Sequence, residues 1–239
     1  MKNESKLKLH LGCGEKYLEG YVNIDFPPSE HSVLTPKVDM YYDIRTLQYP
    51  DNSVDEIQSH HLFEHFSRTD VLKLLFRWRR WLKPDGKLVI ETPDFYGCAI
   101  AYAFAPTRKR RMELGRHMFG SQEAKWAYHL DFWDKAKFKY VLKKAGFKNI
   151  KIRRYRNGLA QHFPKVPFLN IAGNLLPNAF YKKYGSHKLP NIVVTVQKDG
   201  AFALDEDSVA KEILSEYLVG REGENMLKPW LEDYHKELK

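Results

Sequence analysis

Residues 10–26, HLGCGEKYLEGYVNIDF, contain the features that decide the fold. An apolar-alternating run over 7–12 ends in a glycine-rich turn, and a second run over 21–26 places Asp25 before two prolines. Gly12 and Gly14 free the backbone and let a ligand approach its amide groups, while Asp25 at a strand end suits the two hydroxyls of a ribose. A structural turn and a capping aspartate are the alternative. The short spacing from Gly14 to Asp25 predicts an abbreviated first helix.

Strand and helix patterns alternate along the rest of the chain. They predict an α/β, Rossmann-like fold with a mostly parallel, doubly wound sheet and an antiparallel edge strand. Residues 1–200 are expected to form one domain, with an insertion at 97–133 over the active site and a loop at 157–190. Residues 201–239 are expected to form a helical C-terminal extension. Strands are predicted over 7–12, 21–26, 37–44, 54–59, 87–93, 147–155 and 191–198, and helices over 69–82, 134–145 and about 205–239.

Charge is spread unevenly over the 239 residues, whose net charge is +9. The last forty residues hold ten acids and five bases, which leaves −5 there and +14 in the body. Basic clusters at 77–83, 108–111 and 143–156 favour phosphates, nucleic acid or an anionic membrane surface, although solvated helix faces would have the same composition. With only two cysteines and no apolar leader, we expect a cytoplasmic protein with reduced thiols.

Three further segments carry a family resemblance: DIRTLQYPDNSVDEI (43–57), SHHLFEHF (59–66) and RWLKPDGKLVIETPD (80–94). With the GCG turn and Asp25, they resemble the class I S-adenosylmethionine-dependent methyltransferases over residues 7–155 and 191–198. The segments HMFGSQ and YHLDFWD are most similar to a bacterial branch associated with polysaccharide biosynthesis.

This resemblance implies S-adenosylmethionine as the cofactor, bound at the carboxyl ends of the strands. It places Asp25 on the ribose and Asp43 on the adenine amino group, and Ile44 would cover the adenine. His60 would lie near the sulfonium, and Ser59, which ends the fourth strand, also belongs to the predicted site. The turn Gly12, Cys13 and Gly14 would pass beneath the methionine part, with Cys13 as a small residue and not a nucleophile.

The methyl acceptor is less determined by the sequence. Methyl transfer to a hydroxyl needs a group that takes its proton, and we predict His129 for this role with Asp131 orienting the ring. Asp94, directly after the fifth strand, is the second candidate base, and a packing or capping role is the alternative for each. His60, His61 and His65 with Glu64 superficially resemble a zinc site, but the H-E-x-x-H order is absent, so we predict no metal.

The favoured function is methylation of oxygen in a small molecule or glycan, because aromatic residues of the insertion suit sugar rings or apolar acceptors. An RNA or DNA methyltransferase is the runner-up, supported by the basic body, although the Asn-Pro-Pro-Tyr-like tetrapeptide is missing where this chain has SHHL. A non-catalytic binding protein of the same fold is less favoured, since Gly12, Gly14, Asp25 and Asp43 are all present. The missing third glycine of a dinucleotide turn disfavours a nicotinamide-dependent dehydrogenase.

Overall fold

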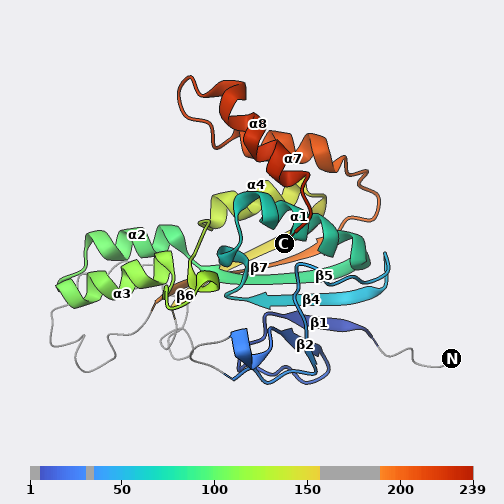
Figure 1. Ribbon diagram of the computed structural model, residues 1–239, viewed down its shortest axis with the longest axis horizontal. Coiled ribbons are helices and arrows are strands. Elements are labelled where there is room, and N and C mark those ends of the chain that lie inside the picture. Colours follow the sequence, from blue (N-terminus) through green and yellow to red (C-terminus); the bar gives the residue numbers. More distant parts are fainter. Residues whose placement is uncertain (1–5, 31–34, 157–188, 239) are drawn as a thin grey trace.

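The computed structural model describes residues 6–30, 35–156 and 189–238. Its centre is a seven-stranded sheet in the order β3-β2-β1-β4-β5-β7-β6 (Figure 1). The first five strands in this order are parallel neighbours, whereas β7 runs antiparallel to both β5 and β6. The strands are β1 (Lys8–Leu11), β2 (Val22–Asp25), β3 (Met40–Tyr41), β4 (Val54–His60), β5 (Leu82–Pro93), β6 (Phe147–Arg156) and β7 (Pro190–Lys198).

The predicted Rossmann-like, mostly parallel sheet is confirmed, with its antiparallel pair at one edge. The reversed strand of that pair is β7, one place in from the edge strand β6. The first connection is shortened as the spacing predicts: residues 12–21 form turns and no α-helix. After β2 the chain forms the short helix η1 (Pro28–Glu30).

The two faces of the sheet differ in chemistry because side chains alternate along each strand. The neighbouring residues Leu9, Ile57, Leu88 and Val196 are fully buried. Helices α1 (Arg68–Trp81) and α4 (Lys135–Lys144) lie over this apolar face (Figure 1). The adjacent residue on each of these strands points to the opposite face, which carries Lys8, Glu56, Lys87 and Gln197.

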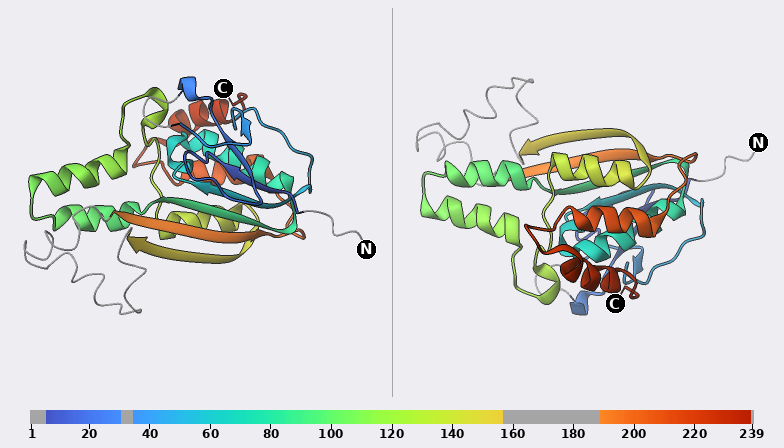
Figure 2. Two further views of the ribbon diagram at one scale, coloured as in Figure 1. Left: turned by 90° about the horizontal axis from the view of Figure 1, so that it is seen from below. Right: turned by 90° about the horizontal axis from the view of Figure 1, so that it is seen from above.

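The predicted insertion begins as soon as β5 ends. Helices α2 (Phe95–Ala103) and α3 (Arg108–Phe119) form a hairpin that extends away from the sheet (Figures 1 and 2). The chain then forms η3 (Lys125–Ala127) and an isolated bridge between Gly120 and Tyr128 before entering α4. Of the predicted loop 157–190, residues 157–188 lie outside the described residues.

The helical C-terminal segment consists of α7 (Glu206–Ser215) and α8 (Gly223–Tyr234), which cover α1 (Figure 2). The Arg68 guanidinium of α1 lies 4.2 Å from the ring centre of Tyr217 and 4.9 Å from that of Trp230. Leu214 and Tyr234 are buried in the main core. The division at residue 200 into domain and extension stays a prediction. None of the helices in the described ranges is long and apolar enough to cross a membrane.

Candidate active site

The glycine-rich turn after β1 is fixed by its backbone. Gly12 and Gly14 have φ values of +65° and +52°, a region that favours glycine. The Gly12 amide donates to Ile24 O over 2.9 Å, which joins the turn to the end of β2. A Cβ atom on Gly12 would lie 2.7 Å from Cδ1 of Leu62. Position 12 therefore favours glycine by its backbone conformation, and a larger residue would also displace the Leu62 side chain.

Asp25 closes the turn from the end of β2. Its Oδ2 atom accepts a hydrogen bond from the Gly14 amide over 2.6 Å, and its Oδ1 atom accepts one from the Phe26 amide over 2.7 Å. The residue is only 8% exposed. Each carboxylate oxygen can accept a further hydrogen bond. The backbone thus orients this carboxylate beside the turn, where ribose hydroxyls are expected.

Cys13 is buried within the turn, with its Sγ atom 3.5 Å from Lys37 O. Burial and the neighbouring Asp25 carboxylate raise the pKa of the thiol to about 12. The group therefore remains a protonated thiol at neutral pH. This agrees with a small packing residue and not with a nucleophile.

Asp43 and Ile44 lie in the loop that follows β3. Arg45 clamps Asp43: its Nη2 lies 2.8 Å from Oδ2, and its backbone amide donates to Oδ1 over 2.9 Å. The same guanidinium lies 5.7 Å from the ring centre of Phe26, directly after Asp25. This contact brings the predicted ribose and adenine sites together. Ile44 is 4% exposed, and an adenine amino group would share the Asp43 carboxylate with Arg45.

Ser59 and His60 are neighbours at the end of β4, so they point to opposite faces of the sheet. Ser59 is fully buried on the apolar face. His60 lies on the polar face, where Nδ1 is 3.1 Å from Glu91 Oε2 and Nε2 is 3.0 Å from Gln58 Oε1. Both ring nitrogens therefore already have partners, and the two residues do not meet on one side of the sheet.

A cluster of histidine and glutamate side chains forms where the hairpin returns to the sheet. The helix η2 (Phe63–His65), just after β4, supplies Glu64 and His65. The His129 ring lies 4.7 Å from that of His65, edge to face, and His129 Nε2 is 4.0 Å from Glu64 Oε1. We call Glu64, His65 and His129 the acceptor cluster. The cluster thus places the predicted base, His129, near the carboxylate of Glu64, which precedes the insertion in the sequence.

The protonation of His129 follows from its surroundings. Its Nδ1 lies 3.2 Å from Met118 O, so this nitrogen carries the proton and Nε2 keeps its lone pair. Burial lowers the pKa of His129 to about 4, although the Glu64 carboxylate opposes this effect. At neutral pH the ring is therefore uncharged, as a proton acceptor must be.

Asp131, predicted to orient His129, is engaged elsewhere. Its Oδ2 atom lies 2.5 Å from Nζ of Lys137, one turn into α4, and Oδ1 accepts from the Phe132 amide over 2.9 Å. Burial lowers the pKa of Lys137 to about 8 against the opposing effect of Asp131. The carboxylate found 4.0 Å from His129 is that of Glu64. The structure thus replaces the expected His129–Asp131 pair by His129 with Glu64.

Asp94, the second candidate base, stands at the start of α2 and is 2% exposed. Its Oδ2 atom is paired with Nε of Arg154 over 3.1 Å. Asp94 therefore already has a cationic partner within the described residues.

Glu64, and not Asp131, is the carboxylate beside the predicted base. It is 2% exposed, and its Oε1 atom lies 3.3 Å from Nδ1 of His61. Burial alone would raise the pKa of Glu64, but the hydrogen bond and charge of His61 hold it below its ordinary value. The signal was the HHLFEH segment at a strand end, which brings ionisable groups to the ligand-binding edge.

The acceptor cluster also has the composition of a cation site. One possible ligand atom from each of Glu64, His65 and His129 lies within 4.8 Å of the others. This set differs from the one considered in the sequence, since His129 takes the place of His60 and His61. That the site holds no metal stays a prediction.

Residues 9–90 match a family model described as a methyltransferase domain. With the strand order and the turn joined to Asp25, this match supports a class I S-adenosylmethionine-dependent methyltransferase. Such a domain implies S-adenosylmethionine as the cofactor. A search of curated proteins finds no significant match.

Several solved structures are similar to this chain. A phosphoethanolamine N-methyltransferase from Haemonchus contortus has 13% identity and a TM-score of 0.45 over 83% of this chain, which spans 50% of that protein. A methyltransferase from Archaeoglobus fulgidus has 17% identity and a TM-score of 0.45, over 81% and 86% of the two chains. A methyltransferase from Methanosarcina mazei has 14% identity and a TM-score of 0.48, over 82% of this chain and 93% of that chain.

Proposed function

We propose that this methyltransferase transfers its methyl group to a hydroxyl oxygen of a small molecule or glycan, with His129 as the acceptor-side base. The observation that carries the proposal is the acceptor cluster, in which an uncharged, half-buried imidazole lies 4.0 Å from a buried carboxylate. The cluster lies just after β4 and at the foot of the hairpin, near the edge of the sheet where the cofactor is expected. Glycan modification would agree with the polysaccharide-associated resemblance.

For methyl transfer to a hydroxyl, the protein must position the acceptor and remove one proton from it. In an in-line displacement the acceptor oxygen attacks the methyl carbon while the sulfonium leaves as a thioether. His129 Nε2 would take the hydroxyl proton as the new carbon–oxygen bond forms. The resulting imidazolium would lie 4.0 Å from the Glu64 carboxylate, whose negative charge stabilises it.

Aromatic side chains beside the cluster support a ring-shaped or apolar acceptor. Phe132 packs against Phe95 with ring centres 5.2 Å apart and remains 42% exposed. Tyr128 and Leu130, on either side of His129, are also exposed. Exposed rings beside a proton acceptor suit a sugar, which stacks through its apolar face and presents hydroxyls at its edge.

On the cofactor side, we assign the ribose to Asp25 and the adenine amino group to Asp43 with Ile44. The turn over Gly12, Cys13 and Gly14 is assigned to the methionine part, with His60 near the sulfonium. The engaged nitrogens of His60 make it a contact through its ring and not a proton donor or acceptor.

An acceptor screen tests the proposal. The purified chain would be incubated with S-adenosylmethionine carrying a labelled methyl group and panels of glycans, small hydroxyl compounds, RNA and DNA. We expect label in a glycan or a small hydroxyl compound. Label only on nitrogen, or only in nucleic acid, would overturn the proposed acceptor and leave the methyltransferase identification intact.

A nucleic-acid acceptor is the second candidate, favoured by the exposed cations of α3. If it is correct, binding to RNA or DNA should fall steeply with salt and still select one sequence or structure, because each neutralised phosphate releases counterions. For a glycan enzyme we expect weak binding without selection. Fluorescence anisotropy with unrelated oligonucleotides between about 50 and 200 mM salt separates the nucleic-acid acceptor from the glycan acceptor. Over this interval a protein with about six phosphate contacts loses ~10³-fold in affinity.

A further inference from the structure

The hairpin of α2 and α3 exposes apolar side chains to an unusual extent. Tyr102 is 44% exposed, Phe104 57% and Met112 70%. Tyr102 and Phe104 lie at the end of α2, and Met112 lies in the first half of α3. Among the residues that the structure describes, the hairpin's own buried cluster consists of Ala101, Ala105 and Leu114, packed by Leu189. A soluble surface seldom gathers large apolar groups without a binding role.

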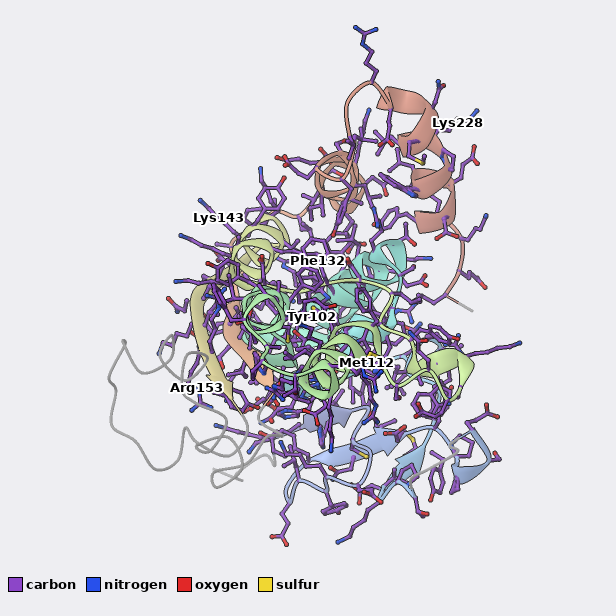
Figure 3. All side chains as sticks on the ribbon, turned by 90° about the vertical axis from the view of Figure 1, so that its left-hand side faces the viewer. Tyr102, Met112, Phe132, Lys143, Arg153 and Lys228 are labelled. Carbon is purple, nitrogen blue, oxygen red and sulfur yellow. The ribbon has the colours of Figure 1, made fainter. Side chains whose placement is uncertain are left out.

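Cations surround these apolar groups. Helix α3 carries Arg108, Lys109, Arg110, Arg111 and Arg116 but a single acid, Glu113, which pairs with Arg110 over 3.1 Å. Arg108, Lys109 and Arg111 are exposed. We call Tyr102, Phe104, Met112, Arg108, Lys109 and Arg111 the hairpin tip. Figure 3 looks onto this end of the molecule, where Tyr102 and Met112 lie on the two helices nearest the viewer.

We propose that the hairpin tip docks onto an anionic lipid surface. Aromatic and unbranched apolar side chains enter the interface between headgroups and acyl chains, while arginine and lysine pair with lipid phosphates. The hairpin begins after Asp94 and returns to the sheet before His129. Docking through its tip therefore turns the ligand-binding edge of the sheet towards the lipid.

The charges favour lipid over the other partners. Two tips facing each other in a symmetric dimer would place several exposed cations against one another. RNA or DNA would pair with the cations but leave Met112 and Phe104 without an apolar partner. An anionic bilayer satisfies both kinds of side chain. The surface lies outside the acceptor cluster, so this inference does not depend on the proposed acceptor.

Vesicle sedimentation with the full chain tests the proposal. We expect it to pellet with vesicles of phosphatidylcholine and phosphatidylglycerol, and at least about tenfold more weakly with phosphatidylcholine alone, because both attraction and insertion are needed. Two variants at exposed positions are informative: Y102S/F104S/M112S removes apolar area, and R108Q/K109Q/R111Q removes charge. Each should lower binding to the anionic vesicles by at least about tenfold. Circular dichroism confirms that both are folded.

The matched control is K135Q/K139Q/K143Q, which removes the same charge from exposed positions of α4 and should keep most of the binding. Lys143, labelled in Figure 3, lies on α4, away from the hairpin. An equal loss in this control would overturn the proposal, because net charge and not the hairpin tip would then be responsible. Failure of the unmodified chain to pellet with anionic vesicles would overturn it as well. So would self-association or RNA binding that the hairpin variants abolish while vesicle binding persists.

Discussion

Replacing His129 by alanine is expected to lower turnover by about 10²–10⁴-fold, the contribution typical of general-base catalysis. Affinity for S-adenosylhomocysteine should stay nearly unchanged, because the cofactor is assigned to the turn after β1 and to Asp25. Steady-state kinetics with the acceptor found in the screen gives the turnover, and isothermal titration gives the affinity. Together the two measurements separate catalysis from cofactor binding.

The matched control is His235→Ala, since His235 is exposed at the end of α8 and far from the cluster in sequence. The pH profile adds a second readout. Because burial lowers the pKa of His129 to about 4, its base form persists below the ordinary histidine range. Turnover of the unmodified enzyme should therefore be flat from pH 7 to about 5 and fall as the pH approaches 4. Near wild-type turnover in His129→Ala would make this histidine a packing residue, and Asp94→Asn would be tested next.

Asp25→Ala is expected to weaken binding of S-adenosylhomocysteine by about 1.5–3 kcal/mol, roughly 10–150-fold, because hydrogen bonds to a charged group are lost. The variant also loses the acceptor for the Gly14 amide, so the turn itself becomes less ordered. Isothermal titration measures the change, and NAD serves as a ligand that should not bind to either protein.

Asp25→Asn separates these two effects. Asparagine keeps a carbonyl oxygen for the Gly14 amide but has no charge and offers fewer acceptor sites. We expect an intermediate loss of affinity. If Asp25→Ala stayed folded and bound S-adenosylhomocysteine as tightly as the unmodified chain, Asp25 would have no place in the cofactor site.

Much of the fold could be predicted because its strands and helices carry buried apolar residues at regular spacings. The helix expected over 69–82 is observed as Arg68–Trp81, with Leu74 and Trp78 fully buried on one side. The hairpin of α2 and α3 could not be predicted in the same way. Most of its surface faces solvent, so its apolar residues show no helical period. The position of the insertion between the fifth strand and the next helix was predictable, because the alternation of strand and helix patterns stops there.

The contacts among the predicted site residues could be anticipated where neighbouring strand ends bring them together, and not where distant segments meet. Gly14 and Asp25 follow neighbouring parallel strands, so strand ends alone bring them together. Asp131 was paired with His129 because the two are neighbours in the sequence. The start of α4 instead brings Lys137 to Asp131, and η2 brings Glu64 to His129. Those contacts depend on how the insertion returns to the sheet, which no local pattern records.

The late arrival of β7 has a consequence for synthesis on the ribosome. Strand β5 ends at Pro93, but its second neighbour begins at Pro190, which is 190 − 93 = 97 residues later. At typical translation rates the nascent chain therefore spends about 5–20 s with this edge of the sheet unpaired. An open, apolar edge such as that of Leu88 and Ile90 is a template for pairing with other chains. Chaperone dependence of folding should accordingly concentrate in the interval before residues 190–198 emerge.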